Sequence, residues 1–481
     1  MFLSYLQIEV PLVFFTIALG ISITTEPIFL YWARCVEIYG SVELGNISNF
    51  CDHLALNETS ENVVQADLNI GNDILSGAET LPALLSAPLL GWWSDKRAGR
   101  RWPLLIGYCS LSVSYLVKLA ATLLYTRVAS IYPIMFVSHV ISAIGGPPIV
   151  FAMLFSMISD LGRRSDKAAS RLTFRVGVAF ALITLAWAIG QAVTTAVRST
   201  LDPSRAYSLS TAISLIVVVA GLFYSCLAVR DTHQIDLEEV KRTPLCRAML
   251  GGVQEIVMVL ARRRAGWNRL CLNFAMFAAF AEFMLLANVM LLYVVKRQPF
   301  SWSDVTYIEY TILLWLLASI GYSLWPVVQM GVPCLTGKDT LLVVIGLVFG
   351  VAIMVGRAVA QDTWTLFALL SLQPFAAAID VALRAVIMKL VDEDETGCTI
   401  AAQHALQALA PTAAALVFGA VYNATLDQWP AFVFALMAAI QMVVLATQIA
   451  THLLITPAWK GAEAPHDERS LIGEAENREE E

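Results

Sequence analysis

The chain contains 481 residues, of which 58% are hydrophobic and only 14% are charged. Soluble domains carry about 25% charged residues, so this chain has too few to cover a surface that faces water, and its mean hydropathy is +0.68. Lys and Arg form no stripe interleaved with aromatic residues outside the connections between apolar segments, which excludes a nucleic-acid-binding surface. The composition predicts an all-α protein that crosses the lipid bilayer many times.

Twelve apolar segments are long enough to cross a membrane, because a hydrocarbon core of roughly 30 Å takes about 20 helical residues. They cover residues 9–33, 71–94, 103–125, 130–159, 172–197, 206–229, 268–295, 305–330, 340–360, 364–390, 398–422 and 430–455. The pattern predicts two six-helix halves, residues 1–229 and 268–455, joined by a central loop, residues 230–267, and followed by an acidic tail, residues 456–481. The first segment is too long, and lacks a cleavage site, for a removable signal peptide.

The connections after the second, fourth and sixth segments are rich in Lys and Arg, whereas those after the first, third and fifth carry few. The positive-inside rule therefore places the basic connections and both termini in the cytoplasm. Three glycosylation sequons fall on the opposite, external side, as glycosylation requires; they begin at Asn46, Asn57 and Asn423.

Cys35 and Cys51 share the first external loop, where an oxidising environment lets cysteines pair. Two free thiols are the alternative. The eight cysteines include no CxxC pair and no cluster with His, so we expect neither a metal site nor a cofactor. Motifs of the HExxH or GxSxG kind are also absent from the sequence, so we do not expect an enzyme.

The connection between the second and third segments reads GWWSDKRAGRRWP over residues 91–103. Gly99 permits a turn before the next helix. Asp95 is placed to pair with Arg100 or Arg101, and such a pair would close the bundle on the cytoplasmic side and break when it opens. A plain basic anchor for the membrane surface is the alternative.

This connection resembles the G-x-x-x-D-[RK]-x-G-[RK]-[RK] signature of major facilitator superfamily transporters, with one extra residue before the second glycine. The matching residues are Gly91, Asp95, Gly99, Arg100 and Arg101. The resemblance implies a fold of twelve helices that works by alternating access.

Three further stretches resemble solute carrier family 46, which contains the proton-coupled folate transporter and carriers of peptidoglycan fragments and cyclic dinucleotides. They are EVPLVFF…TTEPIFLYW (9–32), MISDLGRRSDKAASRLTFR (157–175) and LRAVIMKLVDEDETGCTIAA (383–402). The resemblance implies proton-coupled transport of a small organic anion or zwitterion that is folate-like, muropeptide-like or nucleotide-like. A receptor or scaffold of the same fold that does not transport is the alternative.

Ionisable residues inside the apolar segments are candidates for the site, because a charge at the bilayer centre costs about 2.5–3.5 kcal/mol on insertion scales. We single out Glu26, Lys118, His139, Asp160, Arg175, Glu282, Glu309, Asp380, Arg384 and His404. Asp160 and Arg175 lie near the cytoplasmic ends of their segments, where they could simply brace the loop between them.

Asp380 and Arg384 lie one helical turn apart, so each can neutralise the other. An arginine fork also suits a carboxylate or phosphate on the transported solute. The family resemblance implicates Arg384 in substrate binding and proton coupling, and it matches Asp160 to an aspartate that the folate carrier needs. A purely structural Asp380–Arg384 ion pair is the alternative.

Two residues of the folate carrier's proton relay are missing, because Phe180 and Phe283 stand where that carrier has glutamate and histidine. Glu282, His139 and His404 are the remaining candidates for carrying the proton, since histidine titrates near neutral pH. A structural role is the alternative for each of them.

Flexible and polar positions indicate a path between the halves. IGGPP, residues 144–148, should bend the fourth segment. Gln373 and Pro374 interrupt the tenth segment, and Gln403, His404 and Gln407 give the eleventh a polar face. A cavity between the halves accounts for these residues together, whereas polar helix packing accounts for some of them.

The tail should be disordered, because it is acidic and lacks aromatic residues. Asp467, Leu471 and Ile472 match the acidic dileucine pattern that clathrin adaptors recognise on endolysosomal cargo. The sequence thus leaves the plasma membrane and the endolysosomal membrane as alternative locations.

Overall fold

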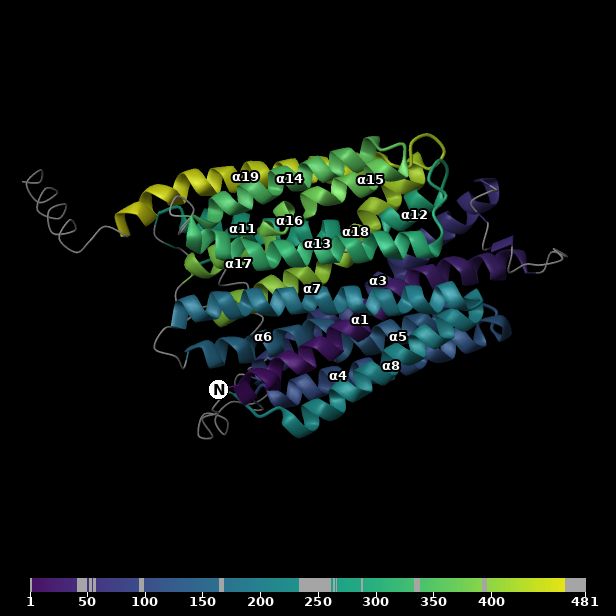
Figure 1. Ribbon diagram of the computed structural model, residues 1–481, viewed down its shortest axis with the longest axis horizontal. Coiled ribbons are helices and arrows are strands. Elements are labelled where there is room, and N and C mark those ends of the chain that lie inside the picture. Colours follow the sequence, from purple (N-terminus) through teal and green to yellow (C-terminus); the bar gives the residue numbers. More distant parts are fainter. Residues whose placement is uncertain are drawn as a thin grey trace, which may run out of the picture.

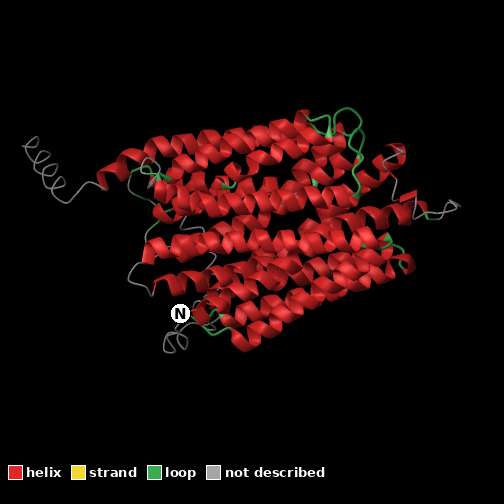
Figure 2. Cartoon of the chain, in the orientation of Figure 1, coloured by secondary structure: helices red, strands yellow, loops and turns green. Residues whose placement is uncertain are grey.

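The computed structural model describes residues 2–40, 50–51, 54, 58–94, 99–163, 168–232, 261–262, 264, 266–286, 289–332, 338–391 and 396–462. Within these residues the chain is helical and contains twelve helices that are long and apolar enough to span a membrane. The prediction of an all-α polytopic membrane protein is confirmed, and Figure 2 shows the described chain as helices joined by short loops.

The first half packs as one bundle, in the lower part of Figure 1. Its helices are α1 (Phe2–Tyr39), α3 (Glu58–Trp93), α4 (Arg101–Leu124), η3 (Tyr125–Arg127), α5 (Tyr132–Gly145), α6 (Pro147–Arg163), α7 (Ala168–Thr200) and α8 (Pro203–Ala228). The predicted bend in the fourth segment is present, because α5 and α6 meet at Gly146.

The second half forms the upper bundle of Figure 1. Its helices are α11 (Asn268–Leu286), α12 (Met290–Lys296), α13 (Asp304–Gly331), α14 (Asp339–Val359), α15 (Thr363–Leu369), η4 (Leu370–Leu372), α16 (Gln373–Ala376), α17 (Ala378–Lys389), α18 (Thr396–Thr425) and α19 (Phe432–Ala462). The tenth predicted segment is thus built from short helices around Gln373 and Pro374. The interruption of the seventh segment, between α11 and α12, was not predicted.

The second segment begins earlier than its hydropathy predicts, at Glu58 rather than at residue 71. Glu61, Gln65 and Asn69 are polar, and each is no more than 1% exposed. Hydrogen bonds replace their water: Tyr31 donates to Glu61 Oε1 at 3.1 Å, and Tyr422 donates to Gln65 Oε1 at 2.7 Å. A polar helix turn is therefore buried by partners that lie far away in the sequence.

Close backbone packing brings α1 against α7 inside the first half. A Cβ atom added to Gly20 would lie 2.7 Å from the backbone oxygen of Trp187. Only glycine leaves room for the two backbones to approach this closely. Trp187 also stacks on Trp315 of α13, with ring centroids 5.0 Å apart, so α1, α7 and α13 are packed in series.

Two helix pairs join the halves: α3 runs along α18, and α7 runs along α13. We call the end of the bundle that carries the Cys35–Cys51 disulfide the disulfide face, and the opposite end the Arg100 face. The start of α1 and the end of α19 both lie at the Arg100 face, on the left of Figure 1. An even number of spans requires this arrangement.

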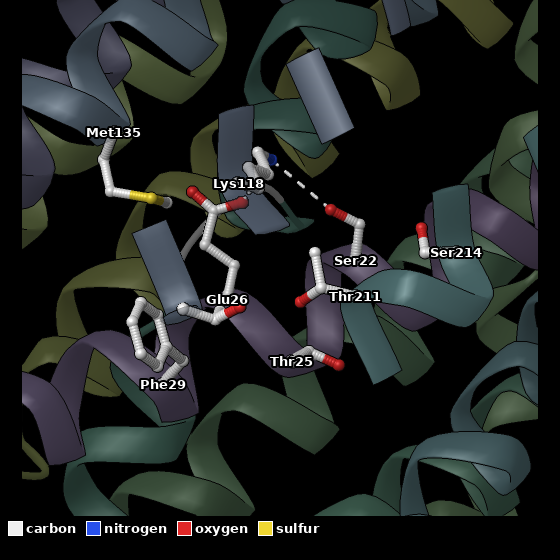
Figure 3. Close-up of a pocket in the computed structure, with 9 residues that line it drawn as sticks. Ser22, Thr25, Glu26, Phe29, Lys118, Met135, Thr211 and Ser214 are labelled. Atoms are coloured by element: carbon white, nitrogen blue, oxygen red, sulfur yellow. Dashed lines mark hydrogen bonds and ion pairs between the residues drawn. The ribbon is translucent and has the colours of Figure 1, made fainter. Parts of the chain in front are cut away.

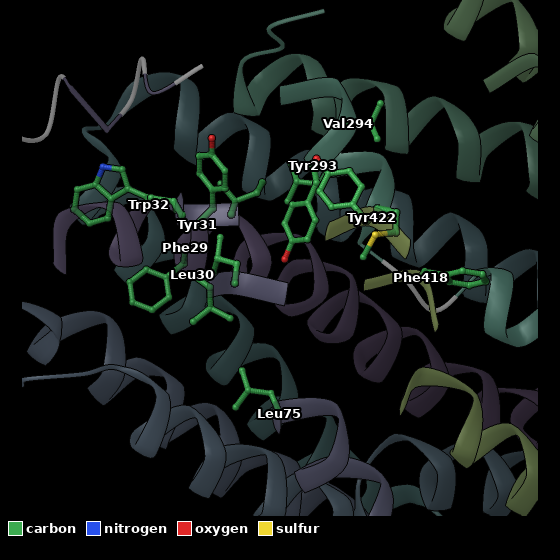
Figure 4. Close-up of a cluster of buried hydrophobic side chains, with 14 of the residues drawn as sticks. Phe29, Leu30, Tyr31, Trp32, Leu75, Tyr293, Val294, Phe418 and Tyr422 are labelled. Atoms are coloured by element: carbon green, nitrogen blue, oxygen red, sulfur yellow. The ribbon is translucent and has the colours of Figure 1, made fainter. Parts of the chain in front are cut away.

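Near the disulfide face a cluster of buried side chains closes the seam between the halves. Tyr31 of α1 and Leu75 of α3 belong to the same cluster as Tyr293 of α12 and Phe418 and Tyr422 of α18. Figure 4 shows these side chains gathered from the two bundles. The halves therefore share one core at this end.

Candidate functional site

Arg384 lies on α17, at the interface between the halves. Its guanidinium carbon is 4.7 Å from the ring centre of Phe180 on α7 and 5.4 Å from that of Phe155 on α6. Both distances fall in the range of cation–π contacts, which are stronger when the cation is desolvated. A cation of the second half is thus held against aromatic faces of the first.

The sequence pairs Arg384 with Asp380, and the structure corrects this. Tyr322 of α13 donates a hydrogen bond of 2.5 Å to Asp380 Oδ2. Among the described residues, no ion pair joins Asp380 to Arg384, and Arg384 donates no hydrogen bond. Their spacing of one turn brings the two charges into electrostatic range but does not make them partners.

The half-buried Arg384 guanidinium therefore keeps its hydrogen-bond donors unused. Guanidinium carries five N–H donors in a fork that matches carboxylate and phosphate oxygens. An unpaired charge in the membrane is costly, and such residues mark substrate pathways. Chemically, this arrangement can bind the anionic group of a small molecule between the two halves.

Glu282 of α11 lies deeper in the second half. Both of its carboxylate oxygens accept hydrogen bonds from Gln441 Nε2 of α19, at 3.1 and 3.2 Å. It is in electrostatic range of Asp380. The sequence candidates Glu282, Asp380 and Arg384 are thus brought into one region of the second half.

Four ionisable side chains meet inside the first half, and we call them the N-half charge cluster: Glu26, Glu79, Lys118 and His139. Lys118 Nζ lies 2.5 Å from Glu26 Oε2, and His139 Nε2 lies 2.6 Å from Glu26 Oε1. His139 Nδ1 lies 3.3 Å from Glu79 Oε2, an ion-pair distance. The partners of His139, Glu26 of α1 and Glu79 of α3, both belong to the first half, whereas Arg384 belongs to the second.

A small cavity lies beside this cluster (Figure 3). A volume of about 20 Å³ inside it is open to the centre of a water molecule, and about 10–15 Å³ suffices to hold one water. Polar side chains from three helices line it, namely Ser22, Thr25, Glu26, Lys118, Thr122, Thr211 and Ser214.

Sequence reasoning missed Glu79, although it lies within the second apolar segment as an acid among GAETLPALL. The rule that treats every acid in an apolar segment as a candidate would have found it.

Asp160 lies at the Arg100 face, near the end of α6, rather than near Arg384. Arg100 Nε approaches Asp160 Oδ2 at 3.2 Å, and Thr232 donates to the same oxygen at 3.0 Å. Arg100 Nη1 also donates to Ser94 Oγ at 3.1 Å. Asp160 therefore belongs with the loop contacts that the sequence offered as its alternative role.

Asp231, after α8, binds the turn at the start of α4. The Arg100 backbone N–H donates to Asp231 Oδ1 at 3.0 Å. Arg101 donates from Nη2 to the Cys226 carbonyl oxygen at 2.6 Å. Gly99 has a φ of +68°, and the Asp231 carboxylate occupies the place that a Cβ would take. Asp95, the predicted partner of Arg100 and Arg101, lies outside the described residues.

At the disulfide face, ionic contacts join the halves. Arg198 Nε of α7 lies 2.9 Å from Asp304 Oδ2 of α13, and Tyr207 donates to the same oxygen at 2.9 Å. Lys296 at the end of α12 binds the other oxygen of Asp304. Asn69 of α3 donates to Asn423 Oδ1 of α18 at 2.6 Å.

The remaining predicted residues are placed as follows. Cys35 and Cys51 form a disulfide with Cα atoms 5.7 Å apart, and Gly91 lies in the last turn of α3. Gln403 is 4% exposed on α18, and His404 lies on the same helix. Outside the described residues lie Asn46, Asn57, Asp467, Leu471 and Ile472.

The described residues contain no group of three or more His, Cys, Asp or Glu side chains that could hold a metal ion. The carboxylates described above contact arginine, lysine, histidine, amide or hydroxyl groups instead. The arrangement is suited to binding anions and protons.

The comparisons with known proteins agree with this architecture. The profile of the Major Facilitator Superfamily matches residues 52–330, which extend from the first half into α13. No significant match was found among curated protein sequences.

Solved structures share the fold at low sequence identity. The human organic anion transporter MFSD10 (TETRAN) superposes with a TM-score of 0.64 and 17% identity, over 92% of this chain and 98% of that chain. The xylose transporter XylE from E. coli, in a partially occluded inward-open conformation, gives a TM-score of 0.55 and 15% identity, over 90% of this chain and 96% of that chain. A structure described as showing substrate recognition in proton-dependent oligopeptide transporters gives a TM-score of 0.57 and 10% identity, over 95% of this chain and 99% of that chain.

Proposed function

Because the chain belongs to the Major Facilitator Superfamily, we propose that it is a secondary-active transporter of a small organic anion or zwitterion, coupled to protons and working by alternating access. The observation that carries this proposal is the unpaired guanidinium of Arg384 between the halves. A ligand carboxylate or phosphate would supply the acceptors that the described residues leave out.

Binding at Arg384 would also connect the ligand to both halves. Phe155 and Phe180 belong to α6 and α7, whereas Arg384 belongs to α17. Anion binding withdraws charge from the aromatic faces, so the ligand changes the contact that holds the halves together at this depth. Differential contacts of this kind are what a ligand needs to shift a conformational equilibrium.

The chemistry of the site narrows the substrate. Phe180 stands where the resembling folate carrier has a glutamate, so the residue beside Arg384 is aromatic rather than acidic. An aromatic face and a free guanidinium favour a flat or ring-bearing anion. Folate-like, muropeptide-like and nucleotide-like solutes of the solute carrier family 46 type all meet this description.

The sequence supports an orientation and favours no single membrane, so the location is part of the proposal. We assign the Arg100 face to the cytoplasm from its Lys and Arg content, and the disulfide face to the exterior or the organelle lumen. The acidic dileucine residues of the tail would then be available to clathrin adaptors and direct the protein to endolysosomes.

Uptake into proteoliposomes tests the proposal. The probes are folic acid, muramyl dipeptide and a cyclic dinucleotide, each measured with and without an inward proton gradient. Wild-type protein should give saturable uptake of at least one probe. Arg384→Ala should abolish that uptake, and Arg384→Lys should retain part of it, because a point charge replaces the fork.

Arg357→Ala is the matched control. Arg357 is another arginine of the second half, but it lies on α14 and donates to Tyr310 at 3.3 Å. Its substitution should leave uptake near the wild-type level. Saturable uptake that survives Arg384→Ala for every transported probe would rule out the assigned anion site.

A further inference from the structure

The N-half charge cluster places His139 between two carboxylates. Nε2 faces Glu26 Oε1 at 2.6 Å, and Nδ1 faces Glu79 Oε2 at 3.3 Å. A neutral imidazole has one donor and one acceptor nitrogen, so one of these contacts would set an acceptor against a carboxylate. Both contacts are favourable only when the site holds an additional proton.

Three other helices supply the charged groups around His139. Glu26 comes from α1, Glu79 from α3, and Lys118 from α4. Lys118 also donates to Ser22 at 3.3 Å and lies 5.5 Å from the ring centre of Tyr115. The α8 residues Thr211 and Ser214 add hydroxyl groups to the neighbouring cavity.

The net charge of the cluster differs between its protonated and deprotonated states. With His139 protonated, two cations face two carboxylates and the cluster is neutral. Loss of the proton leaves one carboxylate without a cation, inside a segment that crosses the membrane. An unpaired charge there is unfavourable, so the cluster has to rearrange or admit water when the proton leaves.

Glu79 is the member of the cluster that a proton can reach. Its side chain is 38% exposed, compared with 12% for His139, 13% for Lys118 and 15% for Glu26. A proton arriving at the Glu79 carboxylate can pass to Nδ1 of His139, which is already at ion-pair distance. The small cavity lined by Glu26 and Lys118 can hold a water near Glu26.

The residue after Glu79 lies on the seam between the halves. Thr80 donates to the Ala408 carbonyl oxygen of α18 at 3.1 Å, and Thr412 of α18 donates to Thr80 Oγ1 at 2.6 Å. A rearrangement of Glu79 therefore acts on α3 next to the hydrogen bonds that hold α3 to α18. Glu79 and the seam residue Thr80 thus lie on the same turn of α3.

We propose that His139, held between Glu26 and Glu79, is the proton-binding residue of this transporter, and that Glu79 delivers the proton from the space between the halves. The inference rests on the proposed function. It places the proton in the first half and the anion at Arg384 in the second, so the two are coupled through the movement of the halves rather than by direct contact.

Two transport assays separate this inference from the proposed function. Equilibrium exchange of a transported probe, with equal pH on both sides, needs the anion site and the movement of the halves but no net proton transfer. Uptake driven by a proton gradient needs the proton site as well. Both are measured in proteoliposomes with the probe that wild-type protein transports.

His139→Gln should retain exchange and lose the stimulation of uptake by the gradient. Its exchange rate should also become independent of pH. Glu79→Gln, at the most exposed position of the cluster, should lose the stimulation in the same way. It tests the inference if the His139→Gln protein does not fold. His452→Gln is the matched control, because His452 lies on α19 and contacts Thr340 at 2.7 Å; it should keep both activities.

Undiminished stimulation by the gradient in His139→Gln and Glu79→Gln overturns the inference and leaves the proposed transporter intact. Loss of stimulation that appears in Glu282→Gln but in neither of those variants also overturns it, because the proton would then bind in the second half. Absence of both exchange and uptake in wild-type protein, for every probe, counts against the proposed function itself.

Discussion

Arg198 at the end of α7 forms an ion pair of 2.9 Å with Asp304 at the start of α13, and this contact joins the two halves at the disulfide face. Asp304 is buried, and its second oxygen binds Lys296. The aromatic cluster around Tyr31 and Tyr422 lies at the same end. The structure is therefore closed by both ionic and apolar contacts at this face.

Asp304→Asn should open the disulfide face more readily than Arg198→Ala. The asparagine removes the negative charge that faces both Arg198 and Lys296, whereas the alanine leaves Asp304 paired with Lys296. We expect the ratio of open to closed molecules to rise at least about tenfold in Asp304→Asn, which corresponds to about 1.4 kcal/mol. Spin labels at Leu201 and Gln361, in the loops of the two halves, would report the change as a longer distance.

Lys389→Ala provides the control for this experiment. It removes an ion pair of 2.6 Å with Asp339, which lies within the second half and does not join the halves. The distance distribution should not change. A closed population of unchanged size in Asp304→Asn would mean that the apolar cluster alone holds this face shut.

Gly99→Ala should destabilise the Arg100 face. Gly99 has a φ of +68°, and the Asp231 carboxylate occupies the space of an added Cβ. Left-handed backbone costs a non-glycine residue about 1–3 kcal/mol. Thermal unfolding in detergent should show a lower midpoint temperature, and uptake into proteoliposomes should be slower.

Gly91→Ala is the matched substitution, since no atom lies within 4 Å of the Cβ that it adds. Alanine is favoured over glycine inside a helix by about 1 kcal/mol, so the midpoint should stay or rise. Equal effects of the two substitutions would contradict the role assigned to the turn at Gly99.

Reduction of the Cys35–Cys51 disulfide should lower the stability of the protein. The bond closes a loop with a sequence separation of 16 residues, and a loop of this size is worth about 3 kcal/mol by chain entropy. Cys51→Ser should reproduce the effect of dithiothreitol on the unfolding midpoint. Cys109→Ser, at an exposed free thiol, should not, and dithiothreitol should have no effect on the Cys51→Ser protein.

Glycosylation at Asn423 should be incomplete. Its side-chain oxygen accepts a hydrogen bond from Asn69, and it lies in the last turn of α18. An oligosaccharide on Asn423 Nδ2 would add bulk beside this contact between the halves. We expect the Asn46→Gln and Asn57→Gln proteins to migrate faster on gels, and Asn423→Gln to change only a minor band. Full occupancy at Asn423 would show that the nascent chain is modified before α3 and α18 pack.

Much of the fold could be predicted from local sequence. The twelve spans follow from apolar length, and the bend at Gly146 follows from adjacent glycine and proline residues, because these properties act within a few residues of each other. The start of α3 could not be predicted in this way. Glu61 and Gln65 look like loop residues until Tyr31 and Tyr422 are placed beside them.

The site was predicted as a set of residue types and not as a set of pairs. Arg384, Asp380, Glu282 and His139 were identified because charges are rare in apolar segments. Their partners were not, since the spacing of one turn suggested an Asp380–Arg384 pair. In the structure Asp380 accepts a hydrogen bond from Tyr322, and Arg384 lies over the rings of Phe155 and Phe180.

The sequence by itself determined that this chain spans a membrane twelve times and that a few charged residues are placed where they are costly. Hydropathy is a property of each segment, so no neighbour is needed to read it. Only the tertiary structure decided that Glu26, Glu79, Lys118 and His139 meet, and that Arg384 finds no hydrogen-bonded partner among the described residues. Those outcomes depend on how α1, α3, α4, α5, α7 and α17 pack, because a charge takes the partner that the neighbouring helix brings within reach.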